Sequence, residues 1–274
     1  MVTLEERITS ALKGAYDTLS EIIPQELKTD KDIMTNGDLE VGEYLKKVVL
    51  GWTERVKVVT EEFPMGERNF VGGDEQLYVC IDDIDGTDNY ARGNGMLQYA
   101  SLIVVFQKRE MNEYYFDDII AAGCVEHSSG KIFYSEKGMG RVKVLDCEKL
   151  EGVELTLPQK GKKPVIITDI VSASAKLIAL LKEVAWLKDF GASATSYCHV
   201  GIKLFDAYVS DNKKGHELGL LYMFCTENGL TMCSIRGLAF KYITYDFNLT
   251  CYKVVAGDPN VCEEVVRMLR RNNF

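Results

Sequence analysis

Hydrophobic and polar residues alternate with two distinct periods in the first half of the chain. Between residues 3 and 23, apolar side chains recur every three or four positions. This spacing predicts a helix with Thr3 as its N-cap and Pro24 beyond its end. A second helical pattern covers residues 40–52. Short apolar runs predict strands at 56–59, 77–81 and 99–106, and a hairpin formed by 119–125 and 131–134. We therefore expect two helices packed on a largely antiparallel sheet.

The second half of the chain alternates between the two kinds of pattern. Strand-like and helical runs follow one another at 164–168, 173–187, 193–204, 206–210, 217–228, 252–256 and 261–271. Such alternation favours an α/β layer. The sequence thus predicts an α+β fold that grades into α/β. We divide it into an N-terminal subdomain at 1–145, carrying a metal and phosphate site, and a C-terminal subdomain at 146–274 that completes the site.

Composition and charge narrow the functional classes. The 274 residues are 46% hydrophobic and carry a net charge of −9, which argues against binding to the phosphate backbone of nucleic acids. The eight cysteines form no C-x-x-C pair, so we expect reduced thiols in the cytoplasm and no zinc site. No signal peptide and no apolar run of about 18 residues is visible, so we expect no membrane association.

The chemistry is concentrated in residues 82–90, Asp-Asp-Ile-Asp-Gly-Thr-Asp-Asn-Tyr. Three carboxylates within four residues repel one another unless a cation lies between them, and such hard oxygen ligands suit Mg²⁺ or Mn²⁺. Gly86 permits a tight turn, and backbone N–H groups at the start of the following helix favour an anion. This combination is typical of phosphoryl transfer to water. The alternative interpretation is an acidic turn that caps a helix.

This stretch resembles the D-P-I/L-D-G-T-x-N-F signature of the inositol monophosphatase and fructose-1,6-bisphosphatase superfamily, with Asp83 in place of the proline. Other motifs follow in the family's order. They are Thr35-x-x-Asp38, Thr60-Glu61-Glu62, Gly123-Cys124-Val125 with Gly138-Met139-Gly140, Gly191-Ala192-Ser193-Ala194, and Val200-Gly201 with Asp206 and Tyr208. The resemblance covers essentially the whole chain. It implies a layered αβαβα fold, two or three Mg²⁺ ions with Mn²⁺ as a substitute, inhibition by Li⁺, and a homodimer.

The resemblance also implies roles for individual residues. Glu61, Asp82 and the carbonyl of Ile84 would hold the first metal, and Asp82 and Asp85 would share the second. Asp85, Gly86 and Thr87 would line the substrate site, the last two binding phosphate through backbone N–H groups. The Thr87 hydroxyl and Glu61 would orient and deprotonate the attacking water. A third metal would lie near Glu61 and Glu62.

The second half departs from the family pattern at the last metal ligand. Where the family has Trp-Asp, this chain has His216-Glu217, and Glu217 is expected to ligate in place of the aspartate, with Asp211 as a fallback. Ala192, Ser193 and Asp211 would lie near the substrate hydroxyls. Arg92 is either a contact to a second phosphate or an exposed surface residue.

Two residues are interpreted as solvated on simpler grounds. His127 falls in the predicted hairpin turn. Lys213 belongs to a Lys213-Lys214 pair expected in a solvated loop, and the alternative is that the pair attracts a phosphorylated substrate.

The expected activity is metal-dependent hydrolysis of a small phosphomonoester, with inositol 1-phosphate as the first candidate substrate. Fructose 1,6-bisphosphate, alone or as a second activity, and adenosine 3′,5′-bisphosphate are the alternatives. The alternative from another class is a catalytically inactive relative that binds metal or phosphate. Only the departure at His216-Glu217 favours it.

Overall fold

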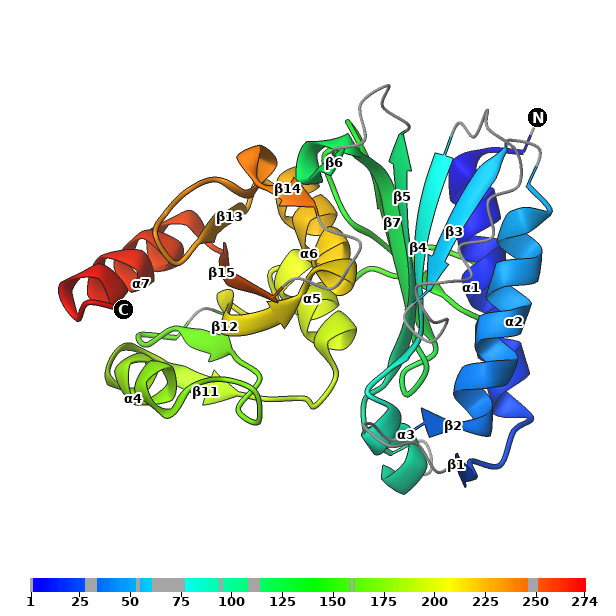
Figure 1. Cartoon of the computed structure of the whole chain (residues 1–274), viewed down its shortest axis with the longest axis horizontal. Helices are drawn as coiled ribbons and strands as arrows, with labels where there is room; N and C mark the ends of the chain where they lie inside the picture. The colour runs from blue at the N-terminus through cyan, green and yellow to red at the C-terminus, as the bar shows by residue number, and fades with distance from the viewer. Residues whose placement is uncertain are drawn as a thin grey trace.

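The computed structural model describes residues 2–27, 34–52, 55–60, 77–93, 96–107, 114–157, 159, 161–245 and 251–274. These residues form five layers in the order helix, sheet, helix, sheet, helix (Figure 1). The predicted αβαβα fold is therefore confirmed. None of the described helices is long and apolar enough to cross a membrane.

The first layer consists of helices α1 (Leu4–Ser20) and α2 (Asn36–Leu50). Each begins at a capping box, in which the N-cap threonine and an acid three residues later satisfy each other's backbone N–H groups. In α1 the pair is Thr3 and Glu6, and in α2 it is Thr35 and Asp38. The second box starts α2 four residues earlier than the apolar pattern predicts.

The first sheet has six strands in the order β3-β4-β5-β7-β8-β9. Their bounds are β3 Val56–Thr60, β4 Leu77–Asp85, β5 Ala100–Gln107, β7 Ile119–Glu126, β8 Lys131–Glu136 and β9 Lys143–Asp146. Only the β3–β4 pair is parallel within the described part of this sheet. Helices α1 and α2 pack on one face through side chains such as Ile8, Leu12 and Leu45. The expected antiparallel sheet with two covering helices is therefore confirmed.

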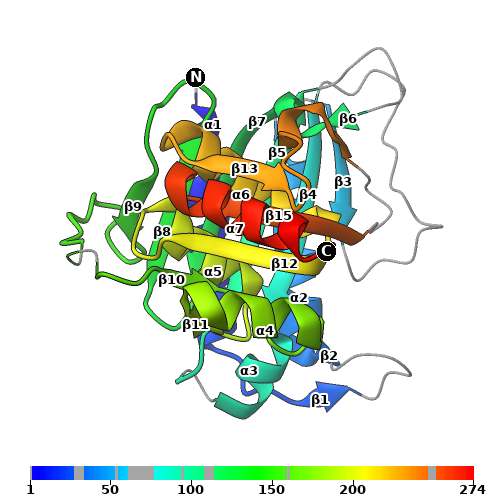
Figure 2. The same ribbon diagram turned by 90° about the vertical axis from the view of Figure 1, so that its left-hand side faces the viewer.

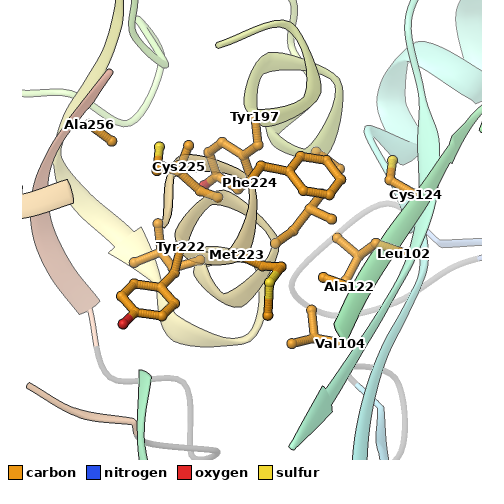
Figure 3. Packing of buried hydrophobic residues seen from close by; sticks show 14 of the residues in the cluster. Leu102, Val104, Ala122, Cys124, Tyr197, Tyr222, Met223, Phe224, Cys225 and Ala256 are labelled. Atoms are coloured by element: carbon orange, nitrogen blue, oxygen red, sulfur yellow. The ribbon is translucent and has the colours of Figure 1, made fainter. Parts of the chain in front are cut away.

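The middle layer consists of helices α5 (Ser193–Gly201) and α6 (Gly215–Glu227). Helix α6 is apolar on nearly every side, as expected for a helix enclosed by other layers. Figure 3 shows Met223 facing Val104 and Ala122 of the first sheet, while Cys225 lies on the opposite side toward Ala256 of the second sheet. One continuous core therefore joins the two sheets.

The second sheet has five strands in the order β11-β10-β12-β15-β13. Their bounds are β10 Val165–Ile167, β11 Trp186–Lys188, β12 Ala207–Lys214, β13 Thr231–Ser234 and β15 Cys251–Gly257. Helices α4 (Ala175–Val184) and α7 (Pro259–Arg271) cover its outer face (Figure 2). The outer core includes Leu177, Val209 and Leu269. The division of the chain at residue 145 stays a prediction.

Short elements complete the described chain. They are β1 Glu26–Leu27, β2 Met34–Thr35, α3 Thr87–Gly93, β6 Tyr114–Tyr115, β14 Thr244–Tyr245 and the 3-10 helices Phe116–Asp118 and Phe240–Tyr242. The prediction of a helix at 173–187 is wrong at its C-terminal end, because the helix stops at Val184 and Trp186 begins β11. Pairing of β11 with β10 outweighs the local helical pattern there.

Candidate active site

An irregularity in β4 turns two carboxylates toward the middle layer. Asp82 pairs with Leu102 of β5 and Asp85 pairs with Ala100, so β4 holds one more residue than its partner. Side chains three residues apart normally lie on opposite faces of a strand, and the extra residue of a β-bulge restores them to one face. Asp83 lies on the other face, where a Cβ added to Gly42 of α2 would come within 2.6 Å of its Oδ2.

Helix α6 adds a third carboxylate to these two. Asp82, Asp85 and Glu217 each offer an oxygen, and the three oxygens lie within 4.8 Å of one another. Asp82 and Glu217 are buried. Burial raises the pKa of Asp85, and the charges of Glu217 and Asp82 raise it further, so that it lies well above its usual range. The cluster therefore joins the first sheet to the middle layer and favours a bound cation.

The N-terminus of helix α5 contacts the same cluster. The backbone N–H of Ala194 donates to Oδ2 of Asp85 across 2.6 Å, and a carboxylate at a helix N-terminus is favoured by the helix dipole. Ala192 and Ser193, expected near the substrate, precede this N–H group and are both buried. Asp85 is thus held between the signature strand and the second half of the chain.

A second bulge, in β12, brings Lys213 into the site. Lys213 lies three residues after Ser210, but their partners on β15 are only two residues apart. The Lys213 Nζ lies 2.8 Å from Oε2 of Glu217 and also contacts the Ser193 hydroxyl. Burial, the largest single effect, lowers the pKa of Lys213, but the interactions with Glu217, Tyr208 and Asp85 together outweigh it, so the pKa is raised. The interpretation of Lys213 as a solvated loop residue is wrong, because the bulge turns its side chain inward.

Thr87 follows the signature turn and contacts the first layer. Its hydroxyl lies 2.9 Å from Oδ1 of Asp38 and 2.8 Å from the carbonyl oxygen of Ile84. The other oxygen of Asp38 accepts hydrogen bonds from the N–H and hydroxyl of Thr35. Burial raises the pKa of Asp38, although these hydrogen bonds oppose the change. The buried carboxylate of Asp38 therefore fixes the orientation of the Thr87 hydroxyl from the side of the first layer.

The signature turn also packs against the loop that precedes α5. Gly86 has a φ of +87°, and a Cβ there would lie 3.0 Å from the Cβ of Ala192. The Asn89 side-chain amide donates to the carbonyl oxygens of Gln98 and Phe190, at 2.7 and 2.8 Å. Gly86 and Asn89 thus fix the signature against the second half of the chain.

Two sequence-predicted residues have other partners, and two more lie outside the described residues. The Asp211 carboxylate accepts hydrogen bonds from the backbone N–H and hydroxyl of Ser174, the N-cap of α4. Arg92 is exposed and pairs with Asp88 one helical turn earlier, at 2.8 Å. Glu61 and Glu62 lie outside the described residues, after Thr60, which pairs with Ile81 beside Asp82. The roles of Asp211, Arg92 and Glu61 stay predictions.

Two residues of the site were not among the predicted site residues. Asp38 stands in the quoted Thr35-x-x-Asp38 motif, which could have indicated it. Lys213 gave no usable signal, because only the bulge in β12 places it beside Glu217. His127, expected to be solvated, is instead buried and stacked between the rings of Tyr16 and Tyr99.

Comparison with known proteins finds relatives over most of the chain and solved structures with a similar fold. A relative, the Nus factor SuhB of Pasteurella multocida (strain Pm70), is 23% identical over 250 residues, 89% of this chain and 85% of the relative. The fold is similar to IMPase/NADP phosphatase complexed with NADP and Ca²⁺, with a TM-score of 0.74, 15% identity, and coverage of 97% of this chain and 94% of that one. It is also similar to a staphylococcal IMPase-I complexed with products, with a TM-score of 0.72, 15% identity, and coverage of 95% and 92%.

At that identity the solved structures support the fold alone. The model of the inositol monophosphatase family matches residues 2–217, which run from α1 to the first turn of α6 and end at the third clustered carboxylate. The chain therefore belongs to the inositol monophosphatase family.

Proposed function

We propose that this protein is a divalent-metal-dependent phosphatase that hydrolyses a small polyol or sugar phosphomonoester. The observation that carries the proposal is the convergence of Asp82, Asp85 and Glu217, with oxygens within 4.8 Å of one another, beneath the signature turn that holds Thr87. Family membership supports phosphatase activity. The metal, the residues that bind it and the substrate are the proposed parts.

The donor set fits a hard divalent cation. The three clustered groups are all carboxylates, and burial followed by repulsion from Glu217 and Asp82 raises the pKa of Asp85. Asp82 and Asp85 would hold the metal, joined by the predicted ligands Glu61 and the Ile84 carbonyl, and Glu217 completes the carboxylate cluster. When bound, the metal polarises the phosphoryl group and makes a coordinated water more acidic.

Thr87 and Asp38 would position the attacking water. The Thr87 hydroxyl proton is directed at acceptors behind it, Asp38 and the Ile84 carbonyl. Its lone pairs therefore remain to accept a hydrogen bond from water. A proton leaving the water can pass to the Thr87 oxygen while the Thr87 proton passes to Asp38. Burial raises the pKa of Asp38, which makes it a better proton acceptor.

The candidate substrates follow from the names of similar proteins and from a position where this chain departs from the family pattern. Inositol 1-phosphate remains the first candidate, since one similar structure is named an IMPase. Another is named an IMPase/NADP phosphatase, so a 2′- or 3′-phosphorylated nucleotide belongs in the same test. Fructose 1,6-bisphosphate stays an alternative. By resemblance, inositol-specific members carry a hydroxyl-binding glutamate where this chain has Ser210 or Asp211, and the absence of glutamate there argues against strict selection for inositol phosphates.

The test is phosphate release from inositol 1-phosphate, fructose 1,6-bisphosphate, NADP and adenosine 3′,5′-bisphosphate, each with Mg²⁺, Mn²⁺ or chelator. Turnover that needs metal supports the proposal, and the order of kcat/KM values identifies the substrate. Asp85→Asn, which removes the charge of a proposed metal ligand, should abolish turnover. Asp88→Asn is its matched control, because Asp88 is exposed and pairs with Arg92. Metal binding without turnover of any compound would instead favour the inactive, ligand-binding relative.

A further inference from the structure

The ammonium group of Lys213 lies inside the carboxylate cluster. It is 2.8 Å from Glu217 and in contact with the Ser193 hydroxyl, and its side chain is buried. Its charge also acts on Asp85, which Ala194 holds next to Ser193. A fixed positive charge therefore already accompanies the third carboxylate of the cluster.

The backbone determines this position. The extra residue between Ser210 and Lys213 places Lys213 on the inner face of β12. Helix α6 begins at Gly215, directly after the strand, so Lys213 and Glu217 are four residues apart across the strand–helix junction. Bulges commonly re-aim a side chain beside an active site. Since both side chains are buried, solvent cannot screen the pair as it would on the surface.

Charge balance indicates what the lysine replaces. Asp82, Asp85 and Glu217 together carry three negative charges when ionised. Lys213 supplies one positive charge and one divalent cation supplies two, so these three described carboxylates need no second divalent cation for neutrality. A second divalent cation at Glu217 would have to displace the ammonium group or bind beside it, and cations within about 4 Å repel strongly at a buried site.

We propose that the ammonium group of Lys213 takes the place of the second divalent cation at Glu217, so that this carboxylate pairs with lysine and does not ligate metal. The inference rests on the proposed function, because it concerns the same catalytic site. Lys213 would supply, beside Ser193, the positive charge that a two-metal site takes from its second ion.

The test is the number of Mn²⁺ ions bound per chain at saturation, with inorganic phosphate present. Equilibrium dialysis gives this number, and the free ion is read by its EPR signal. Lys213→Met removes the charge but keeps the side-chain volume, and we expect it to bind one more Mn²⁺ than the wild type. Lys213→Arg keeps the charge and should bind the wild-type number. Lys214→Met is the matched control, because it removes the same charge from the next position.

Glu217→Gln gives an independent measurement on the partner residue. We expect it to bind as many Mn²⁺ ions as the wild type, and the loss of one ion would overturn the inference. An unchanged count in folded Lys213→Met, verified by circular dichroism, would also overturn it. Phosphate release is measured separately. If Lys213→Met binds one more Mn²⁺ ion than the wild type but the wild type hydrolyses none of the compounds, the proposed function is refuted and this inference stands.

Discussion

The Thr87 hydroxyl lies 2.9 Å from the carboxylate of Asp38, which belongs to a different layer of the fold. The other oxygen of that carboxylate closes the capping box with Thr35 at the start of α2. One side chain thus caps a helix and holds a proposed catalytic hydroxyl. A substitution at Asp38 therefore changes both stability and activity, and the two effects must be separated.

Asp38→Asn should reduce kcat by about 100- to 10,000-fold, because it removes the proton acceptor behind Thr87. The chain offers a matched control in Glu6→Gln, which makes the corresponding change from acid to amide in the Thr3 capping box of α1. An amide oxygen can still accept the hydrogen bond from the N-cap backbone N–H, so both variants should stay folded, but only Asp38→Asn should lose activity. Urea unfolding and phosphate release measure the two effects. Equal kcat values for the two variants would remove Asp38 from the mechanism.

The turn at Gly86 can be tested against another glycine with the same backbone conformation. Gly86 and Gly138 have φ values of +87° and +88°, but a Cβ at Gly138 would have open space around it. Gly138→Ala should therefore cost about 1–2 kcal/mol from backbone strain alone. Gly86→Ala should cost more, since its Cβ would meet Ala192 and the carbonyl of Gln98, and it should lose most activity. Similar stability for the two variants would show that this packing does not matter.

Much of the fold follows from patterns that are local in the sequence. The period of α1, the runs that form β4 and β5, and the signature at residues 82–90 all depend on neighbouring residues. Asp82, Asp85 and Glu217 were predicted as metal ligands from the family resemblance, and the described residues bring their oxygens together. Their binding of metal stays a prediction.

The parts that were missed depend on strand pairing between distant residues. A bulge has no reliable sequence signal, because it is defined by the register against another strand. The bulge in β12 decides that Lys213 faces Glu217, and Asp211 turns outward to Ser174. His127 lies beside a turn that the sequence suggests is exposed, but α1 and the loop before β5 place Tyr16 and Tyr99 on either side of it.

Asp85→Asn should make the metal-free protein more stable. The pKa of Asp85 is raised in the folded state, so its contribution to stability is largest at low pH and is lost as pH rises through the raised pKa. Above that pKa the buried negative charge destabilises the folded state. Asparagine removes this charge, and its side-chain oxygen can still accept the hydrogen bond from the Ala194 N–H. We expect a Tm a few degrees higher in chelator, and little further rise with Mg²⁺. A lower Tm in chelator would contradict this account.

Mild acid should destabilise the protein through His127. Desolvation by burial lowers the pKa of this histidine from 6.5 to about 3. The unfolded chain therefore takes up a proton below pH 6.5 that the folded chain does not, so stability falls as pH decreases through that range. At pH 5 the loss attributable to His127 should be about 2 kcal/mol. This figure depends little on the folded pKa, provided that the pKa lies well below 5.

His127→Phe isolates this contribution. Phenylalanine keeps an aromatic ring between Tyr16 and Tyr99 but cannot titrate. The lost contact between Nε2 and the Ser101 hydroxyl, 2.8 Å in the wild type, should cost about 1 kcal/mol at pH 7.5. Urea unfolding at pH 7.5 and pH 5 should show the wild type losing about 2 kcal/mol more than the variant. If both proteins lost the same amount, the acid sensitivity would arise from other groups, and His127 would have to accept a proton while buried.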